Sequence, residues 1–205
     1  MIQSKAPIAT IFSSPHVLGT TVQELVACAR ANPGKLNFAS PGFGTLPHLL
    51  GEMFRLKTGI NIVHVPYRGA APAVTDLLAG QAQMYFESII LLPHIEVGKV
   101  RALAVADETR LAQLPSVPTT IESGFPSLQS SYWSSVLAPA GTPTSVVNKL
   151  NTAINNIMKS GEMEATLAKL SARPKLGSPE DFAAFMAAEM QKWTAVVNAA
   201  DIKSD

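Results

Sequence analysis

The stretch "LNFASPGFGTLPHLLGEMF", residues 36–54, joins an apolar strand pattern to a helix pattern through a turn that holds a proline and two glycines. Its second half has apolar residues at helical spacing, which predicts an amphipathic helix packed on a sheet. Gly42 and Gly44 permit positive backbone angles and let a ligand approach the main chain. Because successive N–H groups and the positive end of the helix converge at this turn, it favours an anion. A purely structural glycine-rich turn explains the same residues equally well.

Three polar side chains flank these glycines. Thr45 can cap the helix and still offer its hydroxyl, and Ser40 offers a second hydroxyl. His48 lies in the first helical turn, where it could hydrogen-bond a carboxylate or could instead cap or pack. No Gly-Lys-Ser/Thr follows the turn and the dinucleotide fingerprint is absent, so no nucleotide cofactor is expected.

Strand and helix patterns continue to alternate on both sides of this stretch. Thr21 and Glu24 form a capping-box pattern that predicts a helix start, and Gly59 is expected to end the helix after the glycine-rich turn. "INIVHVP" and "QMYFES" are strand-like and "APAVTDLLAG" is helical, which predicts an α/β fold with a parallel sheet covered by helices on both faces. In such sheets ligands bind at the carboxyl ends of the strands, so the loops that follow different strands contribute to one site. The further candidates are Tyr67, Arg68, Gly69, Glu87 and Ser88.

Each of these loop residues has an expected role and a plainer alternative. Tyr67 could supply a hydroxyl or a ring face, or could be a packing residue, and Arg68 could be a solvated surface charge. Gly69 is expected to offer a free N–H near the next helix start. Glu87, followed by Ser88, is expected to accept a hydrogen bond from a ligand hydroxyl, amine or water.

After about residue 115 the chain becomes rich in proline and turn formers, which indicates a crossing between two lobes. Two long helices are expected beyond it, over residues 143–160 and 179–200, the second opened by Ser178 and Asp181. We therefore expect residues 15–130 to form a complete ligand-binding lobe. Residues 1–14 and 131–205 are expected to form part of another lobe.

Composition excludes several classes of function. The chain has 205 residues and a formal charge of +1, without a basic run, which argues against a nucleic-acid partner. The histidines share no metal-like spacing, so no metal site is expected. Ser40 and His48 suggest a hydrolase, but no G-x-S-x-G elbow is present, so no catalysis is expected. The N-terminus lacks the pattern of a signal peptide, and the chain as given is expected to be soluble.

Five segments carry a resemblance to a known family. In order and spacing, from residue 21 to the C-terminus, the chain resembles the Bug-type (TctC-like) solute receptors of tripartite tricarboxylate transporters. The resemblance implies a periplasmic-binding-protein-like α/β fold (type II, Venus flytrap) whose two lobes clamp a small organic acid. It also implies a periplasmic location, delivery to membrane permease subunits and no catalysis, with Ser40–Thr45 as the ligand loop of the second lobe. The segments are "GKLNFASPGFGTLPHLLGEMF", "IVHVPYRGAAPAVTDLLAGQ", "LPHIEVGKVRALAV", "LPSVPTTIESGF" and "SSVLAPAGTP".

The chain also departs from this family. Family members are longer and begin with an export signal, then a strand and a glycine-rich loop that supply the other half of the clamp. The residue after "MYF" is Glu87 in this chain, whereas family members more typically have Asp at this position. The leading hypothesis is a solute-binding receptor, and the alternative is a truncated, non-transporting remnant or interaction module that lacks half of the clamp. The incomplete lobe is expected to favour self-association.

Overall fold

The computed structural model describes residues 2–8, 10–17, 19–170 and 172–203. The chain divides into a larger unit, residues 8–130 and 195–205, and a smaller unit, residues 1–7 and 131–194. The divisions lie after residues 7, 130 and 194. Residues 10–13 fall in the larger unit because they form a strand of its sheet.

The larger unit contains a five-stranded sheet in the order β4-β3-β5-β2-β6. β3 runs parallel to β4 and β5, whereas β2 runs antiparallel to β5 and β6. The sheet is therefore parallel-rich but not purely parallel, because β2 enters it opposite the end of β5, with Thr10 paired to Glu87. The strands are β2 (Thr10–Ser13), β3 (Asn37–Ser40), β4 (Val63–Pro66), β5 (Met84–Glu87) and β6 (Arg101–Val105).

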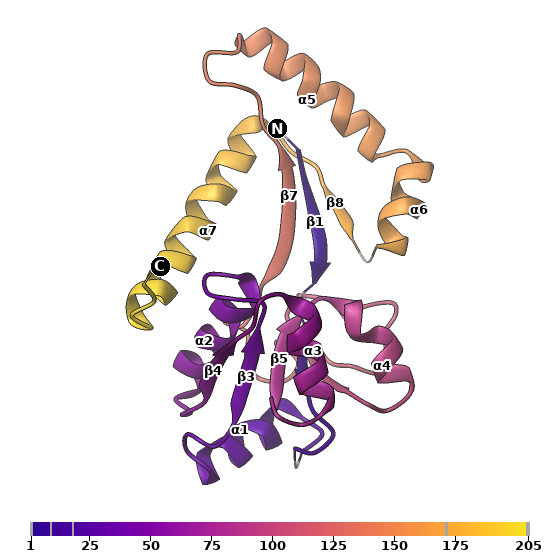
Figure 1. Cartoon of the computed structure of the whole chain (residues 1–205). Helices are drawn as coiled ribbons and strands as arrows, with labels where there is room; N and C mark the ends of the chain where they lie inside the picture. Colours follow the sequence, from indigo (N-terminus) through magenta and orange to yellow (C-terminus); the bar gives the residue numbers. More distant parts are fainter. Residues whose placement is uncertain (1, 9, 18, 171, 204–205) are drawn as a thin grey trace. The chain divides into compact units, whose positions relative to one another are not determined.

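Helices follow these strands where the sequence predicts them (Figure 1). Thr21 and Glu24 form the expected capping box, in which each side chain accepts the other residue's backbone N–H. Gly59 ends the next helix in the left-handed conformation, as expected. The helices of this unit are α1 (Val22–Ala31), α2 (Leu46–Thr58), α3 (Ala70–Leu78), the 3-10 helix Ile89–Leu91 and α4 (Leu92–Glu96).

Apolar clusters lie on both faces of the sheet. On one face, Phe12 and Tyr85 belong to a buried cluster that also includes Leu77 of α3. On the other, Phe86 contacts Phe54 of α2 at a ring-centroid distance of 5.5 Å. Helices thus cover both faces, as the alternating sequence pattern predicts.

Gly51 of α2 sits against the sheet so closely that a Cβ atom there would lie 2.2 Å from Cε2 of Phe38. A helical Gly→Ala change ordinarily gains up to about 1 kcal/mol. Because Phe38 is fully buried, we expect Gly51→Ala instead to destabilise the protein by about 1–3 kcal/mol. Urea unfolding followed by circular dichroism measures this change. Gly161→Ala, in a helix with open space at the same position, is the control, and equal effects of the two substitutions would contradict the packing described here.

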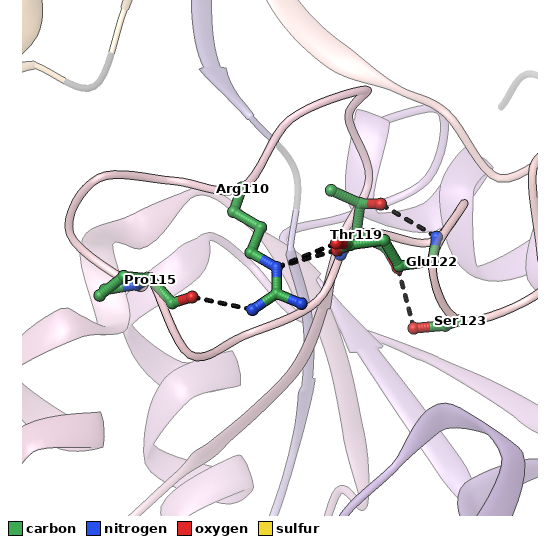
Figure 2. A network of polar contacts seen from close by, with 5 residues as sticks. All are labelled: Arg110, Pro115, Thr119, Glu122 and Ser123. Carbon is green, nitrogen blue, oxygen red and sulfur yellow. Dashed lines mark hydrogen bonds and ion pairs between the residues drawn. The ribbon is translucent and has the colours of Figure 1, made fainter.

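The segment "LPSVPTTIESGF" forms a local polar network (Figure 2). The guanidinium Nε of Arg110 donates to both carboxylate oxygens of Glu122, at 3.2 and 3.0 Å. Glu122 also accepts the backbone N–H of Thr119 at 2.7 Å, while the Arg110 Nη1 donates to the Pro115 carbonyl at 3.0 Å. These hydrogen bonds, that from Arg110 foremost, lower the pKa of Glu122. These hydrogen bonds stabilise the conformation of the loop in which they lie, and this is a structural explanation for the motif.

The smaller unit contains a three-stranded sheet in the order β7-β1-β8, whose strands lie side by side in Figure 1. β1 and β8 are antiparallel. Both expected long helices are present, although residues after 160 add a further helix, α6, that was not predicted. Ser178 and Asp181 exchange side-chain-to-backbone hydrogen bonds at the start of α7. The elements are β1 (Ile2–Ile8), β7 (Ser131–Val136), α5 (Thr144–Met158), α6 (Gly161–Lys169), β8 (Arg173–Lys175) and α7 (Pro179–Ala199). The last residue of β1 and residues 195–199 of α7 are assigned to the larger unit.

The smaller unit has a small core. Among its described residues, only Leu167, Ala172 and Phe182 are buried hydrophobic residues. Helix α5 buries none of its side chains. A cavity of about 370 Å³ lies between α5 and the segment after β7, with Val136, Leu137, Pro139, Val147, Leu150 and Ile154 among its lining residues. The large apolar side chains of this unit that remain exposed are Val136, Leu137, Val146, Leu150, Ile157, Leu170, Leu176 and Met190.

Within the part of the chain that the structure describes, none of the helices combines the length and apolar character needed to cross a membrane.

Candidate functional site

Three loops leave the sheet of the larger unit at the carboxyl ends of the neighbouring strands β4, β3 and β5. Two of them are joined by backbone hydrogen bonds: the Tyr67 N–H donates to the Ser40 carbonyl at 2.9 Å, and the Gly69 N–H donates to the Pro41 carbonyl at 3.1 Å. The expectation of a free N–H at Gly69 is therefore wrong, because that group ties the two loops together. The pairing supports the glycine-rich turn from the side of β4.

Side chains of the glycine-rich turn bond mainly to the turn itself. The Ser40 hydroxyl is fully buried, accepts the Gly42 N–H at 3.1 Å and lies 2.6 Å from Nε2 of His64. Thr45 precedes α2 but makes no side-chain cap, contrary to expectation, because its hydroxyl donates to the Gly42 carbonyl at 2.7 Å. Gly42 and Gly44 adopt φ angles of 144° and 70°, which other residues rarely adopt. Ser40 and Thr45 thus shape the turn.

Main-chain N–H groups at the start of α2 remain available. Within the described part of the chain, those of Phe43 and Leu46 donate to no protein atom. The Gly44 N–H donates to Nδ1 of His48 at 3.1 Å. Unpaired N–H groups at the positive end of a helix stabilise a negatively charged group. This arrangement can bind a carboxylate or another small anion without any cationic side chain.

His48 and His64 stack on each other beneath the turn, with ring centroids 3.9 Å apart and an interplanar angle of 13°. Because Nδ1 of His48 accepts a hydrogen bond from Gly44, the neutral ring carries its proton on Nε2. Burial lowers the pKa of His48, and the Glu52 carboxylate partly opposes this shift. Burial, with a smaller contribution from His48, lowers the pKa of His64 to about 4. Both rings are therefore neutral at pH 7.

Tyr67 and Arg68 have different surroundings. The Tyr67 hydroxyl donates to Oδ2 of Asp76 at 2.7 Å, and burial together with this carboxylate raises the pKa of Tyr67 to about 12. Its hydroxyl is thus already occupied, although its ring packs against the buried cluster next to α3. Arg68 is exposed, which fits either a solvated charge or an approach to a ligand.

The third loop contributes a buried carboxylate. Glu87 accepts a hydrogen bond from the Tyr85 hydroxyl at 3.1 Å and from the Ser88 N–H at 2.7 Å, and both Glu87 and Ser88 are buried. Burial, followed by the charge of Glu87, raises the pKa of Tyr85. Thr10 pairs with Glu87 across the sheet and has a buried hydroxyl without a protein partner. The Thr10 hydroxyl is therefore a buried polar group at this end of the sheet whose hydrogen bond the described residues do not satisfy.

Sequence reasoning missed three residues of this region. The sequence carries no signal that His64 contacts Ser40, Phe43 has no polar group that would mark a site, and Asp76 lies on a helix nine residues after Tyr67. The parallel register that places His64 beside Phe38 exists only once β3 and β4 have paired. Among the described residues, no group of three or more His, Cys, Asp or Glu side chains could hold a metal ion.

A chain that combines an α/β unit, with an anion-favouring loop at the carboxyl edge of its sheet, and a second compact unit has the composition of a solute-binding protein. The chain belongs to the tripartite tricarboxylate transporter family receptors, whose family model, TctC, matches residues 4–202. The family resemblance and the periplasmic-binding-protein-like fold drawn from the sequence are thereby confirmed. This family consists of receptors rather than enzymes.

Relatives and solved structures agree on this family. Protein BugT of Bordetella pertussis is 35% identical over a stretch that covers 96% of this chain and 63% of BugT. The Rhodopseudomonas palustris protein Rpa4515, solved with adipate, is 32% identical with a TM-score of 0.83, covering 98% of this chain and 68% of that one. MatC of the same organism, solved with bound malate, is 26% identical with a TM-score of 0.74, and the match covers 96% of this chain and 67% of MatC. The chain thus spans about two thirds of the length of these proteins.

Proposed function

We propose that the larger unit binds a small organic acid at the start of α2, with the acid's carboxylate accepting hydrogen bonds from the main-chain N–H groups of Phe43 and Leu46. The observation that carries this proposal is the two unpaired N–H groups, of Phe43 and Leu46, at a helix N-terminus. Such groups are already oriented, so a carboxylate gains charge-assisted hydrogen bonds without reorganising the loop.

The other candidate residues take supporting roles in this proposal. Ser40, Gly42, Gly44 and Thr45 hold the turn, and His48 fixes the Gly44 N–H. The loop of Tyr67, Arg68 and Gly69 supports the turn, and the exposed Arg68 would meet a second charged group of the solute. Glu87 and Ser88 offer polar groups at the neighbouring strand end. Adipate and malate, the acids bound to two relatives, are both dicarboxylates, which supports this class of solute.

As the whole-protein function we propose a solute-binding receptor of a tripartite tricarboxylate-type transporter. It would act in the periplasm and pass its solute to membrane permease subunits without chemical conversion. Membership in the receptor family supports this function. A second candidate, an interaction module that no longer transports and that associates with itself, is favoured by the exposed apolar side chains of α5.

Gly44→Val is expected to reduce affinity for an organic acid at least tenfold while the larger unit stays folded. A branched side chain there blocks the approach to the neighbouring N–H groups, and Gly44 has open space where its Cβ would lie. A thermal-shift screen of organic acids identifies a ligand, and calorimetry then compares the variants.

Gly98→Val is the matched control for this experiment. Gly98 has a φ of 71° against 70° for Gly44, and it too has open space at the Cβ position. Both substitutions therefore impose similar backbone strain, but only Gly44→Val obstructs the proposed site. Equal affinity of the Gly44→Val and unaltered proteins would rule the site out.

A further inference from the structure

Phe43 is an exposed aromatic residue that the turn holds in a defined orientation. Its side chain is 56% exposed, yet its ring makes edge-on contacts with two imidazoles. The ring centroids lie 5.5 Å from His48 at 88° and 5.3 Å from His64 at 84°. Edge-to-face contacts of this kind are favourable between aromatic rings.

The two imidazoles beneath Phe43 are themselves held in place. His64 stacks on the fully buried Phe38 at 4.9 Å and contacts the Ser40 hydroxyl through Nε2. His48 accepts the Gly44 N–H. The exposed ring therefore stands on a stack that reaches the core, so a ligand that packs against it does not have to order a mobile side chain.

Polar side chains in the same turn are already partnered. The hydroxyls of Ser40, Thr45 and Tyr67 bond within the protein. A ligand hydroxyl placed against the Phe43 ring would lose its hydrogen bonds to water and would gain none from these side chains, which is unfavourable. A methylene group or an aromatic carbon in that position would gain from burial.

We infer that Phe43 determines specificity at the carboxylate site, favouring acids whose carbon chain is apolar over acids of equal length and charge that carry hydroxyl groups. This inference rests on the proposed function, because Phe43 belongs to the turn whose N–H groups receive the carboxylate. The main-chain N–H groups bind the carboxylate of both kinds of acid. The Phe43 ring distinguishes the two kinds by the carbon chain that follows the carboxylate.

The test uses two dicarboxylates of the same chain length, adipate and its hydroxylated counterpart galactarate, titrated by calorimetry or NMR against the full chain. We expect the unaltered protein to bind adipate more tightly. Phe43→Ala should weaken adipate binding about tenfold, since burial of one methylene is worth roughly a factor of four, and should change galactarate binding less than about twofold. Phe43→Leu should recover part of the preference.

Ile90→Ala is the control, because Ile90 is 55% exposed in the same unit but lies outside the turn. It should leave both affinities unchanged. If Phe43→Ala alters both acids equally, or neither, the role of Phe43 is overturned while carboxylate binding stands. If the unaltered protein binds neither acid, nor any other organic acid in the thermal-shift panel, both the role of Phe43 and the proposed function are overturned.

Discussion

At low protein concentration the smaller unit is expected to unfold at a lower denaturant concentration than the larger unit. Raising the protein concentration is expected to stabilise the smaller unit through self-association. The reason is its exposed apolar surface. Val146, Leu150 and Ile157 of α5 are 45%, 49% and 54% exposed. Full burial of one such side chain stabilises a protein by roughly 1.5–3 kcal/mol, so leaving several exposed forfeits an amount comparable to the stability of a whole domain.

Tryptophan fluorescence can report the smaller unit separately. The chain has two tryptophans, Trp133 and Trp193, and both lie within this unit. Hydrogen exchange over residues 20–115 reports the larger unit. We expect the fluorescence transition to come first in urea and to move to higher urea as protein concentration rises, because association stabilises the associating state by mass action. Light scattering after gel filtration should show dimers or larger species.

Charge substitutions provide the control. Leu150→Lys on α5 should abolish the concentration dependence, whereas Val97→Lys should not, although Val97 of the larger unit is 65% exposed. A monomer at all concentrations, with coincident transitions for the two units, would show that the smaller unit is stable alone and would contradict this prediction.

The second large effect concerns pH. We expect the larger unit to lose stability on acidification because His64 is held neutral. Its pKa is about 4 in the folded protein, against an ordinary value of 6.5. Between these values the unfolded chain binds a proton that the folded chain does not, so the free energy of unfolding falls as the pH falls below 6.5.

The size of this effect follows from the shift. The loss between pH 7 and pH 4 amounts to at most about 3 kcal/mol for His64, since one pKa unit corresponds to about 1.36 kcal/mol. His64 is partly exposed, and solvent screening reduces the figure. The groups that face it are Ser40, Phe38, Phe43 and His48, and His48 adds a loss of the same sign that the Glu52 carboxylate moderates.

Urea unfolding at several pH values, followed by circular dichroism, measures this slope. His64→Gln should show a smaller loss of stability between pH 7 and pH 4 than the unaltered protein, because Gln has no ionisable group. His94→Gln is the control, since His94 lies on α4 outside the stack, and it should retain the full slope. Equal slopes for all three proteins would mean that His64 does not titrate as described.

The sequence by itself was sufficient to predict the local features. Thr21 and Glu24 cap α1, Gly59 ends α2, and Ser178 and Asp181 open α7, all as predicted. These features depend on hydrogen bonds or backbone angles within a few residues, so the local sequence specifies them. The apolar periodicities likewise predicted the strands and helices around the glycine-rich turn and the covering of the sheet, although not α6. The order of motifs was enough to recognise the family.

Only the tertiary structure decided which groups of the turn are free and which are occupied. The Gly69 N–H donates to Pro41, the Tyr67 hydroxyl to Asp76, and His64 contacts Ser40. The tertiary structure also decided that β2 lies between β5 and β6 and runs antiparallel to both. Each depends on the register of paired strands or on a helix packed against them, and a donor with several possible acceptors is assigned only when packing brings one of them within hydrogen-bond distance.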